Sequence, residues 1–329
     1  MFRIFAFLFL PLFLLGADDP GYGSDFSSVD AHARSIKKAT SIEKTAELLT
    51  APYENDMQKV RAIFIWITEN VNYDVKRAIN SKGKTKRTRI VANSEEELAR
   101  IRLDREKNKA KLAFKSGKGV CENYAFLFLF MCQHIGIEAE LVGGFGRNDP
   151  SLIGKTLRGS NHAWNRVKID DKWYLLDATW AAGTIDLNKG RYKKQYREGF
   201  FLSDPKYFVL SHFPDDPSLQ LLKKPLSKDT FTDSPLGHHA LSSGDIYDYF
   251  PLNGLLKNSN GGITLKIWTK DPGATLILLD NRSRTLIPKV IDGDQVSFTI
   301  NRKNLKGHEL TIAKIVENET IPILSYKVI

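Results

Sequence analysis

The feature that most constrains the fold is a long apolar segment in the middle of the chain, residues 120–135. It reads VCENYAFLFLFMCQHI and is followed by Gly136, a residue type that commonly ends helices. A helix that is apolar on nearly every face has to be buried on nearly every face. We therefore expect residues 120–135 to form a buried helix in the core of a folded domain.

The segments around this helix predict a mixed α+β domain. Apolar spacing indicates helices at residues 30–49 and 55–71, the second behind an Asn55–Asp56 cap. Ser94 with Glu97 forms a capping box before a charged helix at 95–114. After Gly136 the period changes, and strands are expected at 137–145, 163–169 and 173–177, the last two joined by a turn at Asp170–Asp171.

The last third of the chain has a different character. A linker rich in Ser, Pro, Gly and His begins near Pro225, and from Ile263 onward short alternating apolar runs are separated by turn sequences. Such runs predict a β-sandwich of immunoglobulin type. With 329 residues and 42% apolar residues, two domains are expected and disorder is excluded. We place the first domain at residues 25–224, the linker at 225–250 and the sandwich at 251–329.

The N-terminus resembles a targeting segment. Arg3 precedes an apolar run, residues 4–15, which ends in Gly16–Ala17 before polar residues. This pattern is typical of a secretory signal peptide at residues 1–17, with an uncleaved anchor as the alternative. The run is short for a membrane span. We expect a secreted or periplasmic protein that is not transmembrane after cleavage.

The net charge of +10 is local, since residues 76–118 hold 15 Lys/Arg and 5 Asp/Glu. We interpret residues 76–89 as an exposed loop. The basic segment 76–118 is either a solvated surface or a surface for an anionic partner such as a cell-envelope polymer. Nucleic acid is disfavoured by export and by the lack of interleaved aromatic residues at 82–89.

Cys121, His162 and Asp177 are residue types that can form a catalytic site with a cysteine nucleophile. Cys121 lies at the start of the buried helix, where free N–H groups and the helix dipole stabilise a thiolate. His162 begins one strand and Asp177 ends the next, so pairing about the Asp170–Asp171 turn brings them together. His162 would take the thiol proton, Cys121 would attack an amide carbonyl, and Asp177 would hold the imidazole.

Other candidates carry less weight. Cys132 is three helical turns, about 16 Å, from Cys121, so both thiols stay free. Trp164 and Trp180 are either core residues or walls of a cleft. Cys132 and His134 point to different helix faces, and no Cys/His spacing indicates zinc, so no metal and no cofactor is expected.

Three motifs resemble, in order and spacing, those of the transglutaminase-like superfamily. They are GVCENYA at 119–125, NHAWN at 161–165 and WYLLDATW at 173–180. The segments FLSDPKYF at 201–208 and HFPDD at 212–216 are similar to the branch related to kyphoscoliosis peptidase. The resemblance implies a papain-like fold in which Cys121, His162 and Asp177 match a catalytic triad. No acidic cluster suited to calcium is present, so no metal is carried over from the calcium-dependent members.

These observations predict an exported cysteine enzyme that acts on protein or peptide amide bonds through an acyl-thioester. Water as the acceptor gives a peptidase, which we favour slightly, and an amine gives a protein-glutamine transamidase. Because the superfamily includes inactive members, the alternative is a catalytically inactive binding or scaffold module.

Overall fold

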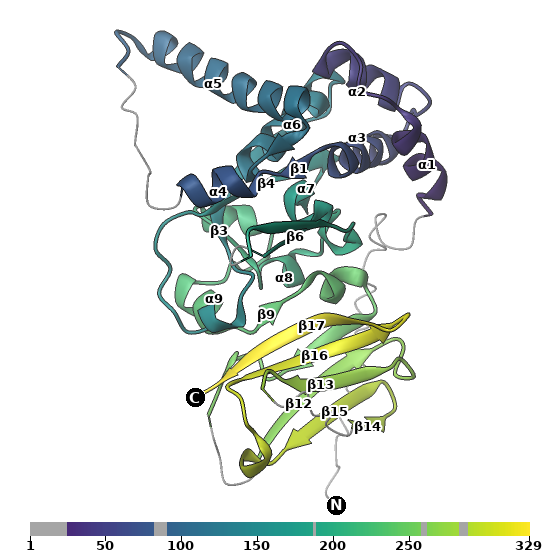
Figure 1. The fold of residues 1–329 in the computed structure, drawn as a ribbon, viewed down its shortest axis with the longest axis vertical. Helices are drawn as coiled ribbons and strands as arrows, with labels where there is room; N and C mark the ends of the chain where they lie inside the picture. The colour runs from purple at the N-terminus through teal and green to yellow at the C-terminus, as the bar shows by residue number, and fades with distance from the viewer. Residues whose placement is uncertain (1–24, 82–90, 187–188, 258–261, 283–288) are drawn as a thin grey trace, which may run out of the picture.

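The computed structural model describes residues 25–81, 91–186, 189–257, 262–282 and 289–329. The expected signal peptide and part of the basic segment, residues 82–90, lie outside these residues. Helices gather at one end of the described chain, a four-stranded sheet lies in the middle, and a β-rich part forms the other end (Figure 1). Within the described residues no helix is both long and apolar enough to cross a membrane.

The helical end is built around α3 and α6. Both are almost fully buried, including Phe64 and Trp66 on α3 and Tyr124 and Phe128 on α6. The burial predicted for residues 120–135 is thus confirmed. The helices of this end are α1 (Ser27–Ser35), α2 (Ile42–Thr50), α3 (Asp56–Asn70), α4 (Val75–Ser81), α5 (Glu95–Ser116) and α6 (Cys121–His134).

Polar caps set where these helices begin. Asn55 accepts a hydrogen bond from the Gln58 backbone N–H, and Ser94 accepts one from Glu97, as the sequence predicts. The helix predicted at 30–49 is instead two helices, because Ser41 caps a new helix by accepting from the Lys44 N–H. The loop predicted at 76–89 is wrong at its beginning, where α4 continues to residue 81.

The central sheet is antiparallel, in the order β5-β4-β3-β8. Asp170 and Asp171 have positive φ angles of 49° and 60°, which matches the tight turn expected between β4 and β5. Asn165 on β4 donates to the backbone carbonyls of Ala125 and Glu140, so this buried side chain ties the sheet to α6. The strands are β3 (Ala139–Gly146), β4 (His162–Ile169), β5 (Lys172–Leu176) and β8 (His212–Pro214).

Short elements complete this part of the chain and lead to the β-rich end. Arg147 is fully buried and donates to the carbonyls of Thr232, Leu210 and Pro235, which fastens the segment after residue 225 to the central sheet. The short elements are β1 (Asn72–Tyr73), β2 (Lys118–Gly119), η1 (Pro150–Leu152), α7 (Ala178–Ala182), β6 (Gly183–Asp186), β7 (Arg191–Lys194), η2 (Glu198–Phe200), α8 (Pro205–Phe208), η3 (Pro217–Gln220), α9 (Lys228–Asp233), β9 (Leu236–Gly237) and η4 (His239–Ser243).

The β-rich end contains two sheets, in the orders β10-β12-β15-β14 and β11-β17-β16-β13. Alternating side chains such as Leu265, Phe298, Ile312 and Tyr326 fill the core between them, as expected of a β-sandwich. The strands are β10 (Ile246–Phe250), β11 (Leu255–Leu256), β12 (Ile263–Thr269), β13 (Leu276–Asp280), β14 (Lys289–Asp292), β15 (Gln295–Ile300), β16 (Glu309–Val316) and β17 (Glu319–Val328).

The sandwich begins earlier than the sequence predicts. Strand β10 lies inside the expected linker 225–250, yet it pairs with β12 in the first sheet. Its register shifts between Ile246 and Asp248, so apolar alternation, the signal that marks a strand, is broken there.

Candidate active site

Cys121 is the first residue of α6, with Val120 as the N-cap. The Asn123 side chain fixes this helix start: its Oδ1 accepts from the Val120 N–H at 2.9 Å, and its Nδ2 donates to the Lys109 carbonyl on α5 at 2.9 Å. The Cys121 side chain is a free thiol, and the residue is partly exposed. It therefore lies at the positive end of the helix dipole, where a thiolate is favoured.

The β4–β5 hairpin brings His162 and Asp177 together. His162 begins β4, and Asp177 follows β5 directly as the N-cap of α7. The His162 Nε2 lies 2.7 Å from Asp177 Oδ2. Oδ1 of the same carboxylate accepts the backbone N–H groups of Thr179 at 2.8 Å and Trp180 at 3.1 Å. The carboxylate is thus held on both oxygens while one of them faces the imidazole.

The charged forms of His162 and Asp177 stabilise each other. Burial alone would lower the pKa of His162, but the charge and hydrogen bond of Asp177, together with the interaction with Cys121, raise it to about 10. Burial alone would raise the pKa of Asp177, but the charge and hydrogen bond of His162 and the hydrogen bond of His212 hold it well below its usual range. At neutral pH the pair is an imidazolium and a carboxylate. Because Nε2 faces Asp177, Nδ1 is the nitrogen left to interact with Cys121.

A second histidine, which the sequence analysis missed, meets the same carboxylate. The His212 Nε2 lies 3.1 Å from Asp177 Oδ2, and the side chain is wholly buried. Burial, acting against the hydrogen bond and charge of Asp177, lowers the pKa of His212 to about 4, so this ring is neutral at pH 7. His212 opens the HFPDD segment, but its approach depends on the pairing of β8 with β3, which sequence spacing does not reveal.

The two tryptophans predicted as core or cleft residues have different places. Trp180 is partly exposed and stacks on His162, with ring centroids 4.9 Å apart at 28°. Trp164 is 1% exposed and packs edge-on against His212, behind the histidine pair. A Cβ on Gly146 would lie 3.0 Å from both His162 Cβ and Trp180 Cζ2, so a glycine on β3 leaves room for this stack.

Tyr73 lies beside Cys121. Strand β1 pairs in parallel with β2, which places Tyr73 opposite Gly119, two residues before Cys121. Burial, with smaller contributions from the charges of Cys121 and Asp177, holds the pKa of Tyr73 above its usual value. The phenol is therefore neutral and available as a hydrogen-bond donor near the thiol.

His162, Asp177 and His212 also have the composition of a metal site, since one ligand atom from each lies within 4.8 Å of the others. In this structure Oδ2 makes direct hydrogen bonds to both rings at 2.7 and 3.1 Å. An ion would have to displace both hydrogen bonds in a mostly buried position. The arrangement is explained by hydrogen bonding between two rings and one carboxylate.

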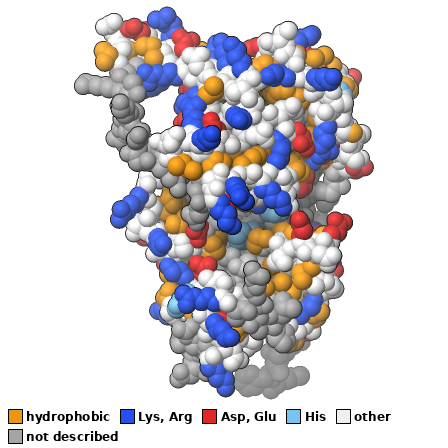
Figure 2. Space-filling view, in the orientation of Figure 1, with side chains coloured by type: hydrophobic (Ala, Val, Ile, Leu, Met, Phe, Trp, Pro, Cys, Tyr) orange, Lys and Arg blue, Asp and Glu red, His pale blue; other side chains and the backbone are white. Residues whose placement is uncertain are grey.

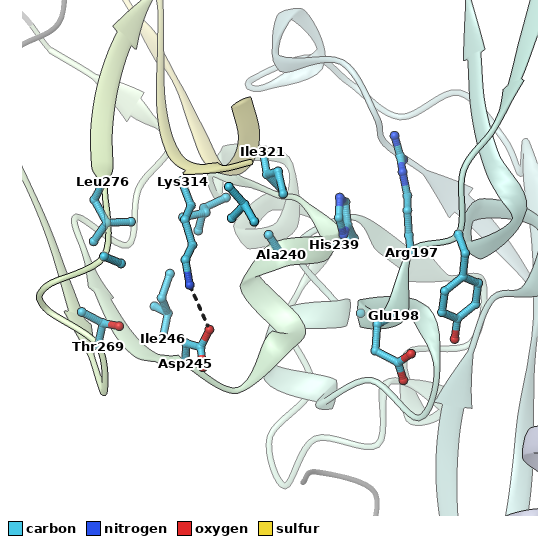
Figure 3. Close-up of a pocket in the computed structure, with 15 residues that line it drawn as sticks. Arg197, Glu198, His239, Ala240, Asp245, Ile246, Thr269, Leu276, Lys314 and Ile321 are labelled. Carbon is cyan, nitrogen blue, oxygen red and sulfur yellow. Dashed lines mark ion pairs between the residues drawn. The ribbon is translucent and has the colours of Figure 1, made fainter. Parts of the chain in front are cut away.

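A separate cavity of about 260 Å³ lies between the central part and the sandwich. Arg197 and His239 line one side, and Ile246, Leu276 and Lys314 line the other, where Lys314 is paired with Asp245 (Figure 3). Phe200 stands between this cavity and the candidate active site: its ring lies 6.3 Å from that of His239 and 5.9 Å from that of His212.

Part of the chain matches a known protein family. Residues 43–178 match the family model of the transglutaminase-like superfamily. This part of the chain is a domain of that superfamily, with a papain-like arrangement of helices and sheet. The resemblance stated from the three sequence motifs is thereby confirmed.

Among proteins of this class, the chain is similar to kyphoscoliosis peptidase. It is 28% identical to the Mus musculus protein and 26% identical to the Homo sapiens protein, over 258 residues in each case, which is 78% of this chain. The chain spans 36% of the length of each of these relatives. A solved structure of a TGase is 18% identical with a TM-score of 0.28, covering 47% of this chain and 32% of that one.

Proposed function

We propose that the chain is a cysteine enzyme that transfers acyl groups from protein or peptide amides, with Cys121 as nucleophile, His162 as acid and base, and Asp177 as the group that orients His162. The observation that carries the proposal is the 2.7 Å contact between His162 and Asp177 beside a cysteine at a helix N-terminus. A charged imidazole held in this way favours the thiolate form of Cys121.

The proposed reaction follows from these charges. The Cys121 thiolate attacks the amide carbon, and the negative charge that develops on the carbonyl oxygen is met by the Cys121 backbone N–H. The His162 imidazolium gives its proton to the leaving nitrogen as the C–N bond breaks, which leaves a thioester and a neutral imidazole. The acceptor then attacks the thioester while the neutral His162 takes a proton from this acceptor. The C–S bond breaks, and the Cys121 thiolate is released.

Two acceptors compete at the second step. Water gives hydrolysis, and a primary amine gives transamidation. The name peptidase carried by the two mammalian relatives supports hydrolysis. A peptide mixture incubated with and without cadaverine separates the two outcomes by mass spectrometry: backbone cleavage in both samples identifies a peptidase, and addition of the amine to glutamine identifies a transamidase.

The nucleophile is tested by the pH dependence of iodoacetamide alkylation. In the wild type we expect Cys121 to react below about pH 7, where an ordinary thiol is mostly protonated. In His162→Ala this reactivity is expected to be lost. Cys132 is fully buried in α6, and burial raises the pKa of its thiol, so it serves as the internal control. Equal inertness of Cys121 and Cys132 in both proteins would overturn the proposal.

A second candidate is a catalytically inactive binding module. It is favoured by the low exposure of the His162 side chain, which is 7%, beside a partly exposed Cys121. The sandwich would then provide the binding surface.

The strand orders β10-β12-β15-β14 and β11-β17-β16-β13 support the proposal that this sandwich is of immunoglobulin type, since they match the two-sheet strand order of that fold.

The setting of the protein is also a proposal. The apolar run at 4–15 supports export to a periplasmic or extracellular space, which N-terminal sequencing of the mature protein tests by locating a cut near residue 17.

The charge of residues 76–118 supports contact with an anionic cell-envelope polymer. Figure 2 shows Lys and Arg interspersed with Asp and Glu over the helical end. Reversing the exposed charges of Arg100, Lys107 and Lys111 on α5 should release the protein from a polyanion column at lower salt.

A further inference from the structure

His212 is held in one orientation by its own surroundings. Its ring stacks on Phe208 with centroids 3.9 Å apart at 16°, and its Nδ1 lies 2.8 Å from the Ser211 hydroxyl oxygen. The backbone is fixed as well, because His212 pairs with Gly146 where β8 meets β3. The ring cannot turn without breaking these contacts.

The hydrogen-bonding partners define the tautomer of His212. Asp177 Oδ2 is a carboxylate oxygen and only accepts, so the His212 Nε2 at 3.1 Å must carry the proton and donate it. A neutral ring then has an unprotonated Nδ1, and the single proton of the Ser211 hydroxyl is donated to this nitrogen at 2.8 Å, the shorter contact, rather than to the Phe208 carbonyl at 3.3 Å. Ser211, His212 and Asp177 form a chain of donors that ends on the oxygen facing His162.

This chain completes the hydrogen bonding of Asp177. Oδ1 accepts two backbone N–H groups, so the position of Oδ2 is set by its two histidine partners. His162 approaches it at 2.7 Å and His212 at 3.1 Å, from two different strands. With His212 present, the carboxylate is restrained toward His162 by a neutral donor that adds no competing positive charge.

We propose that His212 is a positioning residue: oriented by Ser211, it donates its Nε2–H to Asp177 and so holds that carboxylate against His162. The inference rests on the proposed role of the Cys121–His162 pair. His212 touches neither the thiol nor a substrate in this scheme, and it acts through the orientation of Asp177.

The test compares three proteins by the pH profile of Cys121 alkylation. His212→Phe keeps a flat ring for the stack on Phe208 but removes the donor. His212→Gln places an amide N–H near the former Nε2 and retains a donor. We expect His212→Phe to slow alkylation at pH 6 about tenfold, because the thiolate loses a well-placed imidazolium, and His212→Gln to restore most of that rate.

Controls distinguish loss of position from loss of folding. Protection of Cys132 from iodoacetamide reports an intact core in each variant, and Ser211→Ala provides a milder change if His212→Phe does not fold. In Ser211→Ala the ring loses the donor to Nδ1, and a smaller shift of the profile in the same direction is expected.

The outcomes separate this inference from the proposed function. If His162→Ala leaves the pH profile of Cys121 alkylation unchanged, the proposed function fails, and the inference fails with it. If that dependence is present but folded His212→Phe, or Ser211→Ala where His212→Phe does not fold, keeps the wild-type profile, the proposed function stands and the role of His212 is overturned. Equal losses in His212→Phe and His212→Gln would also overturn it, because a retained donor should rescue.

Discussion

A methyl group on Gly119 would lie 2.6 Å from the Cβ of Asn123, closer than two carbon atoms in contact can be. Asn123 is the residue whose side chain bonds the Val120 N–H and the Lys109 carbonyl at the start of α6. The absence of a side chain at Gly119 is therefore what allows Asn123 to fix the position of Cys121.

This relationship predicts the effect of Gly119→Ala. Overpacking of this kind costs about 1–3 kcal/mol, and here it pushes on the helix start itself. We expect both lower stability in urea and slower alkylation of Cys121 at pH 6. Gly273→Ala is the matched control, since among the described residues its new methyl group would meet only Asp271 Oδ1 at 3.5 Å. Unchanged reactivity in Gly119→Ala would show that the helix start tolerates the displacement.

Arg61 offers a test of stability away from the thiol. Its side chain is 4% exposed and bonds Asp30 at 2.7 and 2.8 Å, and it also pairs with Glu198. Arg61→Met leaves the mostly buried Asp30 carboxylate without this partner, so we expect a loss of about 3–5 kcal/mol in the free energy of unfolding. Arg34 is half-exposed and lies 3.2 Å from Glu69 and 3.9 Å from Asp30, so Arg34→Met, which leaves the Arg61–Asp30 pair in place, should cost less than about 1 kcal/mol. Similar losses in the two variants would contradict the importance of burial.

His238 predicts part of the acid sensitivity of the fold. Burial, with the charges of His239, Arg197 and Arg147, lowers the pKa of His238 to about 3. Below about pH 6.5 the unfolded chain gains a proton that the folded protein does not, so stability falls with decreasing pH until the folded pKa is reached. His238→Gln can keep the bond to Ser325 and should remove up to one proton from this slope, about 1.4 kcal/mol per pH unit. Urea titrations between pH 4 and 7 measure the difference, and parallel curves would refute it.

The contribution of the His162–Asp177 pair to stability depends on pH in the opposite sense, because it decreases as the pH rises above neutrality. The pKa of His162 is raised to about 10, so its contribution to stability is complete below about pH 6.5 and is lost as the pH rises toward 10. The Asp177 contribution is present above the usual carboxyl range and is lost only in acid, because its pKa is lowered. We expect the wild type to lose more stability than His162→Gln between pH 7 and 10, as measured by thermal unfolding. A larger loss in the variant would reverse the assigned sign.

Hydrogen bonding, rather than an ion, is expected to organise His162, Asp177 and His212. Dialysis against EDTA should therefore leave the alkylation profile of Cys121 unchanged, while elemental analysis of the purified protein checks for a bound metal. A profile that is lost on chelation and restored by zinc alone would identify this group as a metal centre instead.

Much of the fold was predictable because its signals are local. The Asp170–Asp171 turn, the Asn55 and Ser94 caps and the burial of residues 120–135 each follow from a few neighbouring residues. The break between α1 and α2 also had a local signal, Ser41, which the continuous apolar spacing concealed.

The rest depends on contacts between distant segments. His212 reaches Asp177 only because β8 pairs with β3, and no spacing within residues 205–216 indicates that partner. Strand β10 was missed because a register shift interrupts its alternation. The hairpin that joins His162 to Asp177 was within reach of sequence reasoning, since one short turn determines its register.

Asp177 serves two purposes with one carboxylate: Oδ2 faces the imidazoles, and Oδ1 caps α7. Because the fold uses this cap, we expect a catalytically inactive relative with the same fold to retain the aspartate. Cys121 has no such second duty, as its side chain caps nothing. Under the proposed function, the cysteine is therefore the better marker of an active enzyme when related chains are compared, and the aspartate marks mainly an intact fold.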